Sequence, residues 1–146
     1  MKRIGPKQFV HRHSLSLSAF GVVILLTALY WRSDPSTHVG AFYGNAIADW
    51  TGVLVTVLMT KHLYEKGSAE SKRPKGKLAS MTVEFLREHS LTLVLLITGA
   101  VWVLVFKSMD PNSRWGQVVG NIVSEWTQIL GLVLMTKRLM EVGSKT

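Results

Sequence analysis

Four long stretches without basic residues constrain this chain more than any other feature of its sequence. They cover residues 14–31, 39–60, 90–106 and 115–136, and the only acids within them are Asp49 and Glu125. A helix needs about 20 mostly apolar residues to cross roughly 30 Å of hydrocarbon, and these stretches are too long for barrel strands. We therefore expect an all-α membrane protein with four transmembrane helices, at about 14–31, 38–63, 82–107 and 114–140.

The composition agrees with a membrane protein and excludes several kinds of site. Only 18% of the 146 residues are charged, where soluble domains average about 25%. The chain contains no cysteine, which excludes a disulfide scaffold, a thiol nucleophile and a cysteine-based metal site.

The second half of the sequence repeats the first at a constant shift of 76 residues, which indicates a duplicated helical hairpin. The matches are His13 with His89, Asp34-Pro35 with Asp110-Pro111, Gly40 with Gly116, Gly44-Asn45 with Gly120-Asn121, Trp50-Thr51 with Trp126-Thr127, residues 58–61 with 134–137, and Gly67-Ser68 with Gly143-Ser144. Asp49 is matched by Glu125, so both copies carry an acid at this position.

Each copy contains two spans, so both copies enter the membrane from the same side. This predicts two tandem parallel hairpin repeats related by a pseudo-two-fold axis along the membrane normal. We expect the first repeat in residues 1–70, a basic cytoplasmic linker in 71–81 and the second repeat in 82–146. Of the 17 lysines and arginines, 14 lie on the side of the termini and linker. The positive-inside rule therefore predicts a multi-pass inner or plasma membrane protein with both termini in the cytoplasm.

Small residues recur at four-residue steps in the second span of each hairpin. Such a face lets two helix backbones approach closely in lipid, and we expect these two spans to form the central helix contact. The residues predicted to pack are Gly40, Gly44, Ala48, Gly52, Gly116, Gly120 and Ser124.

A polar stripe runs beside these small residues and brings both acids near the bilayer midplane. An ionisable group at that depth should face protein or water, and two adjacent acids should retain one proton between them. Three roles fit: interhelical hydrogen bonding, an ion or proton site, or contact with a partner protein. The candidate site residues are Asn45, Asp49, Asn121, Glu125 and Gln128.

The linker carries a basic cluster, Lys72, Arg73, Lys75 and Lys77. It fits anionic lipid headgroups, or acts only as a topology signal. Because no aromatic platform accompanies the charge, we expect no nucleic acid as a partner. We also expect no catalytic residues, no cofactor and no metal site, since the sequence contains none of the common catalytic motifs and the outer loops are short.

Two motifs carry a resemblance to a known family. They are the acid-tryptophan pairs Asp49-Trp50 and Glu125-Trp126, and the segment Lys66-Gly67-Ser68-Ala69-Glu70-Ser71. Together they resemble an uncharacterised bacterial family of four-helix membrane proteins with a domain of unknown function. The resemblance implies a four-helix membrane fold and supplies no activity.

The sequence therefore favours a non-enzymatic membrane subunit or an oligomer-forming component. Its second and fourth spans would pack through their small-residue faces and a polar midplane stripe. The expected partners are the lipid bilayer with its anionic headgroups and a second copy of the chain or another membrane protein. The alternative is a small ion or proton channel or transporter that uses Asp49 and Glu125.

Overall fold

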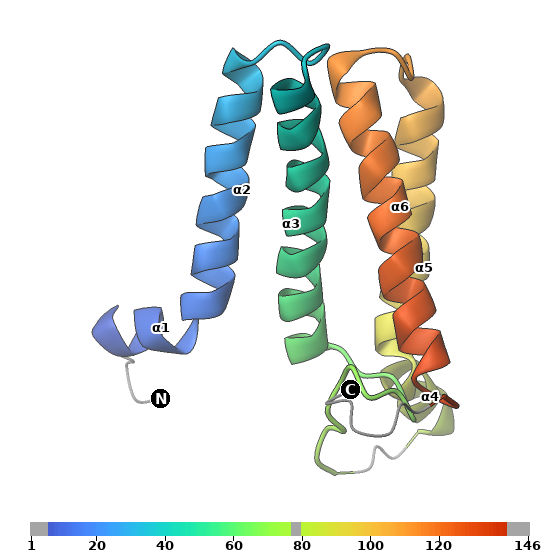
Figure 1. The fold of residues 1–146 in the computed structure, drawn as a ribbon. Coiled ribbons are helices and arrows are strands. Elements are labelled where there is room, and N and C mark those ends of the chain that lie inside the picture. The colour runs from blue at the N-terminus through green and yellow to red at the C-terminus, as the bar shows by residue number, and fades with distance from the viewer. Residues whose placement is uncertain (1–5, 77–79, 140–146) are drawn as a thin grey trace.

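The structure is a computed structural model that describes residues 6–76 and 80–139 (Figure 1). These residues form six helices: α1 (Pro6–Arg12), α2 (Ser14–Arg32), α3 (His38–His62), α4 (Met81–Glu88), α5 (Ser90–Ser108) and α6 (Arg114–Met135). Four of them, α2, α3, α5 and α6, are long and apolar enough to cross a membrane. The prediction of an all-helical chain with four candidate membrane spans is thus confirmed.

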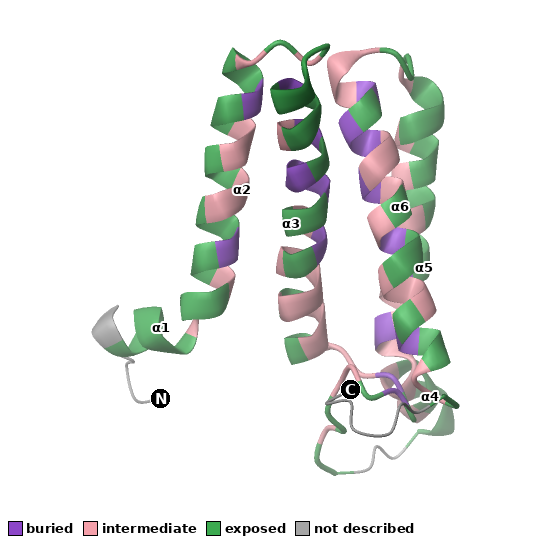
Figure 2. Cartoon of the chain, in the orientation of Figure 1, coloured by how far each residue is buried: buried purple, intermediate pink, exposed green. Residues whose placement is uncertain are grey.

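The four long helices pack in the order α2, α3, α6, α5, so α3 and α6 occupy the centre (Figure 1). One end of the bundle carries the two short connections α2–α3 and α5–α6, and we call it the turn end. The other carries α1, α4 and the segment 63–76, and we call it the loop end. Buried residues gather where neighbouring helices face one another, whereas the outer faces are exposed and apolar (Figure 2). Outer faces of this kind suit contact with lipid.

The helix boundaries agree with the predicted spans except at the loop end. The span expected at 82–107 is broken at His89 into α4 and α5. The matching His13 separates α1 from α2 with nearly the same backbone angles, φ −118° and ψ 13° against φ −120° and ψ 15° at His89, so the break is common to both hairpins. At the second break the Leu91 N–H donates to the Tyr64 carbonyl at 3.0 Å. The span expected to reach residue 140 ends at Met135, and residues 136–138 form a turn.

The turn end is built by an Asp-Pro pair and a glycine in each hairpin. Asp34 accepts hydrogen bonds from the backbone N–H and hydroxyl of Ser36, at 2.9 and 2.7 Å, which hold the pKa of Asp34 below its ordinary value. A Cβ atom on Gly40 would lie 1.9 Å from the Asp34 carbonyl oxygen, and one on Gly116 would lie 2.1 Å from that of Asp110. Any side chain at position 40 or 116 would therefore clash with the backbone of its own turn.

Arg114 joins the two hairpins at the turn end. Its guanidinium donates to the carbonyl oxygens of Tyr30, Trp31 and Ser33, at 2.8, 3.0 and 2.9 Å. The Tyr30 hydroxyl donates back to the Arg114 carbonyl at 2.8 Å. A charged donor that binds three carbonyls at the end of α2 fixes the register of α6 against the first hairpin.

Candidate functional site

Polar side chains meet between α3 and α6 near the middle of both helices. The Asn121 side-chain amide donates to Oδ1 of Asn45 at 2.5 Å. The carboxyl groups of Asp49 and Glu125 are close enough to interact electrostatically, and Gln128 Nε2 donates to Glu125 Oε1 at 3.2 Å. We call these five residues the midplane seam. The structure brings together all five of the predicted candidate residues.

One glycine makes the close approach at the seam possible. A Cβ atom on Gly52 would lie 3.0 Å from Oε2 of Glu125, tighter than nearly all real contacts. The equivalent position in α6 is Gln128, whose side chain reaches Glu125. The seam therefore has a glycine at this position of α3 and a glutamine at the equivalent position of α6. Both of these residues lie next to Glu125.

The other small residues lie against neighbours that differ from those we predicted. A Cβ atom on Gly44 would lie 3.2 Å from the Tyr30 ring, and one on Gly120 would lie 3.0 Å from the Phe106 ring. These glycines therefore admit an aromatic ring of their own hairpin, α2 or α5. Ala48 is fully buried and Ser124 is exposed. The central helix contact between α3 and α6 is present, but of the predicted glycines only Gly52 lies at its polar centre.

One side of the midplane seam is open in the single chain. Asn45, Asp49 and Gln128 are exposed, whereas Asn121 and Glu125 are partly buried. Asp49 lies 11 residues after the start of α3 and 13 before its end, so the exposed carboxyl is near the centre of the span. Polar groups at this depth are costly to expose to lipid. In a bilayer, the seam would need protein or water on its open side.

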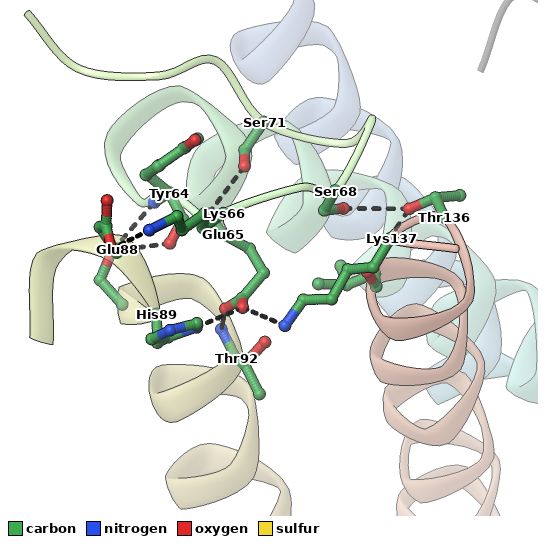
Figure 3. Close-up of polar contacts among 12 residues, drawn as sticks. Tyr64, Glu65, Lys66, Ser68, Ser71, Glu88, His89, Thr92, Thr136 and Lys137 are labelled. Atoms are coloured by element: carbon green, nitrogen blue, oxygen red, sulfur yellow. Dashed lines mark hydrogen bonds and ion pairs between the residues drawn. The ribbon is translucent and has the colours of Figure 1, made fainter. Parts of the chain in front are cut away.

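A second polar cluster lies at the loop end and is centred on Glu65 (Figure 3). Its side chain is fully buried. One carboxylate oxygen contacts Nδ1 of His89 at 2.6 Å and the ammonium group of Lys137. The other accepts from the Thr92 backbone N–H at 3.3 Å. We call Glu65, His89, Thr92 and Lys137 the Glu65 cluster, and it ties the segment after α3 to the ends of α5 and α6.

Burial and hydrogen bonding act in opposite directions on the pKa of Glu65. Burial disfavours the ionised carboxylate, but hydrogen bonds from Lys137, Thr92 and His89 outweigh it and hold the pKa of Glu65 below its ordinary value of 4.5. The carboxylate is therefore ionised at neutral pH and paired inside the protein. A buried ion of this kind is costly to leave unpaired, so removing a partner should destabilise the fold strongly.

Backbone contacts extend the docking of this segment on both sides of Glu65. The Tyr64 N–H donates to the Ser90 hydroxyl at 2.9 Å, and the Lys66 N–H donates to the Glu88 carbonyl at 2.7 Å. The hydroxyls of Ser68 and Thr136 lie 3.0 Å apart (Figure 3). The segment 64–68 thus occupies the space at the loop end between α5 and α6.

The sequence interpretation missed Glu65, because a single glutamate in a loop carries no pattern of its own. A signal was nevertheless present in the repeat. Lys61, Leu63, Glu65 and Gly67-Ser68 recur 76 residues later as Lys137, Leu139, Glu141 and Gly143-Ser144. A charged residue repeated at fixed distance from a helix end indicates a specific contact.

The predicted lipid-binding cluster lies on the same end of the molecule. Lys72, Arg73 and Lys75 are exposed, and Lys77 lies outside the described residues. Within the described parts of the chain, no group of three or more His, Asp and Glu side chains is arranged to hold a metal ion.

We compared the chain with protein-family models, with curated proteins and with solved structures. None of the three comparisons found a match. We therefore infer the function from the geometry of the two polar sites.

Proposed function

We propose that this chain is a non-enzymatic membrane protein that assembles as a homo-oligomer through the midplane seam. The observation that carries the proposal is the open side of the seam, where Asn45, Asp49 and Gln128 are exposed within two helices long and apolar enough to cross a membrane. Lipid cannot satisfy amide and carboxyl groups, whereas the same groups on a second copy can. A two-fold contact would place the open side of one seam against that of the other.

The proposal includes the duplication and the orientation in the membrane. Two interactions, Asn45 with Asn121 and Asp49 with Glu125, join residues 76 positions apart. Contacts between equivalent residues are what a pseudo-two-fold axis between α3 and α6 would produce, and this supports two tandem parallel hairpins. The excess of basic residues supports a plasma-membrane location with the loop end in the cytoplasm. Lys72, Arg73 and Lys75 would then face anionic headgroups.

Cross-linking of single cysteines in membranes tests the assembly, because the chain has no native cysteine. Val53→Cys lies one turn after Asp49 on α3, and Leu17→Cys on α2 is a matched control. Both residues lie 15 positions from the turn end of their helix, and their exposed fractions are 44% and 43%. Oxidation should yield a covalent dimer of Val53→Cys and leave Leu17→Cys monomeric. Equal yields from the two variants would contradict the proposal.

A second function uses the same residues, and the exposure of Asp49 beside Glu125 is the observation that favours it. A carboxyl pair open to a water-filled space between copies would bind a cation or proton. Glu125→Gln keeps the shape of the neutral acid. In the structural role, this variant should fold and assemble like the wild type, and neither protein should carry ion or proton flux in liposomes. Flux in the wild type that Glu125→Gln abolishes would establish the transport function instead.

A further inference from the structure

The loop end of the first hairpin contains an open cavity of about 500 Å³. Its walls come from α2, α3 and the following loop, and the residues used here are Leu15, Val57, Thr60 and Lys61. Beside the cavity, the Lys61 ammonium group lies 3.0 Å from Nδ1 of His13. Leu15 is 63% exposed although it is a large apolar residue.

The helices of the second hairpin carry the same four wall residues, and two of them are buried there. Shifting by 76 residues converts Leu15, Val57, Thr60 and Lys61 into Leu91, Val133, Thr136 and Lys137. Leu91 and Val133 are each only 1% exposed. The segment that covers this site is 64–68, with Glu65 bound to His89 and Lys137 and with Ser68 beside Thr136 (Figure 3).

The sequence contains a second copy of both halves of this contact. The docking segment after α3 has the pattern Lys-x-Leu-x-Glu-x-Gly-Ser from Lys61, and the same pattern begins at Lys137 after α6. The receiving motif His89-Ser90-Leu91 is repeated as His13-Ser14-Leu15. One segment is seated on the second receiving motif, and Glu141 to Ser144 is its counterpart for the first.

We propose that the cavity is the docking site for the C-terminal segment 141–144 of the same chain, with Glu141 bound between His13 and Lys61. The contacts between residues 76 positions apart in α3 and α6 relate the two hairpins of one chain by a two-fold rotation. Such a rotation exchanges the two hairpins, so the segment 141–144 and the cavity belong to the same chain. Residues 64–68, which follow α3, dock on the second hairpin. The two-fold relation then predicts that residues 141–144, which follow α6, dock on the first hairpin. The inference rests on the duplication proposed above and is independent of the oligomer.

Charge and hydrogen bonding at the cavity suit this occupant. Lys61 and His13 offer the same two partners to Glu141 that Lys137 and His89 offer to Glu65. The Lys61 ammonium group and His13 Nδ1 lie only 3.0 Å apart beside the cavity, so a single carboxylate can contact both.

Two cysteine pairs test the docking with an internal standard. Ser68→Cys with Thr136→Cys reproduces the known contact, where the two hydroxyls are 3.0 Å apart. Ser144→Cys with Thr60→Cys is the equivalent pair at the cavity. Mild oxidation of the full chain in membranes should form a disulfide within one chain in both, at rates within about tenfold because the effective concentrations are alike. A third pair, Ser144→Cys with Leu58→Cys, should stay reduced.

Three results would overturn the inference. The cavity pair could stay reduced while the standard pair oxidises. It could form only disulfides between two chains, which would mean that another copy occupies the cavity. It could react no faster than the Leu58 pair, which would mean that the segment has no fixed position. Because none of these measurements involves the seam, they are separate from the Val53 cross-link that tests the assembly.

Charge reversal gives a second measurement that does not depend on cysteines. Lys61→Glu and Glu141→Lys should each lower the thermal unfolding temperature in detergent, and the double variant should recover most of the loss. No recovery in the double variant would contradict a direct contact between these residues.

Discussion

The two hairpins have matching sequences but differ in how well their interiors are closed. Trp126 of the second hairpin is 6% exposed, whereas its counterpart Trp50 is 39% exposed. The Trp126 indole N–H donates to the Thr98 hydroxyl at 2.9 Å. Matching residues of the two hairpins therefore take different roles where the residues facing them differ.

Two positions on the facing helix explain the difference between the tryptophans. α5 carries Thr98 and Gly99, whereas the equivalent residues of α2 are Val22 and Val23. Gly99 leaves room for the Trp126 ring, since a Cβ atom there would lie 3.2 Å from its Cδ1. A valine at either position removes the hydrogen-bond acceptor or the space. The second hairpin can therefore seat its tryptophan inside, and the first cannot do so in the same way.

The largest effect is expected from breaking the Glu65 cluster, which closes only the second hairpin. Lys137→Met leaves the buried Glu65 carboxylate without its cationic partner, and we expect a loss of about 3–5 kcal/mol in the free energy of unfolding. Lys66→Met is the control, because Lys66 is an exposed partner of Glu88 at 2.9 Å and should cost less than about 1 kcal/mol. Denaturant unfolding in detergent measures both. Equal losses would mean that the Glu65 cluster does not stabilise the fold.

An intermediate effect is expected from making the second hairpin resemble the first. Gly99→Val introduces the residue found at position 23 and forces the Trp126 ring to move, at a cost of about 1–3 kcal/mol. Gly21→Val is the control in the first hairpin, because a Cβ atom on Gly21 has no neighbour within 4 Å. The measurement is the thermal unfolding temperature of both variants. A similar change in both would show that the space beside Gly99 is unimportant.

A smaller effect is expected from the hydrogen bond alone. Thr98→Val keeps the shape of the side chain and leaves the Trp126 N–H without its partner, at a cost of about 1 kcal/mol. Thr27→Val removes a hydroxyl that bonds only to the Val23 carbonyl of its own helix, so it should cost less. The same unfolding assay compares them, and a larger loss in Thr27→Val would contradict this account of Trp126.

The four candidate spans could be predicted from the sequence, because length and apolar composition alone identify a candidate membrane helix. The polar residues of the seam were also accessible, since their spacing places them on one face of each helix. The partners of Gly44 and Gly120 were not accessible, because spacing shows that a face is small but not which helix it meets. The break at His89 was missed because the residues on both sides of it are helical, and only the backbone angles at His89, like those at His13, separate the two helices.

The smallest effect on stability is expected from changing the pH between 7 and about 5, where Glu65 stays ionised. Its pKa is lowered in the folded protein, so its contribution to stability is present above the ordinary value of 4.5 and is lost as pH falls through the lower folded value. Between pH 7 and about 5, the stability advantage of the wild type over Glu65→Gln should therefore not decrease, because Glu65 stays ionised and its partner His89 can only gain charge. Below pH 4.5 the difference should shrink. A difference that shrinks already between pH 7 and 5 would contradict the assigned pairing.

Both hairpins contribute residues to the midplane seam, whose open side we propose to join two copies of the chain. The most direct measurement is the protein mass in detergent, by light scattering, of the wild type and of two variants at Asp49. Wild type and Asp49→Asn, which keeps the polar shape, should both be oligomers, whereas Asp49→Leu should be a folded monomer with unchanged helix content. An Asp49→Leu protein that has the same mass as the wild-type oligomer, or a wild type that is monomeric, would contradict the account.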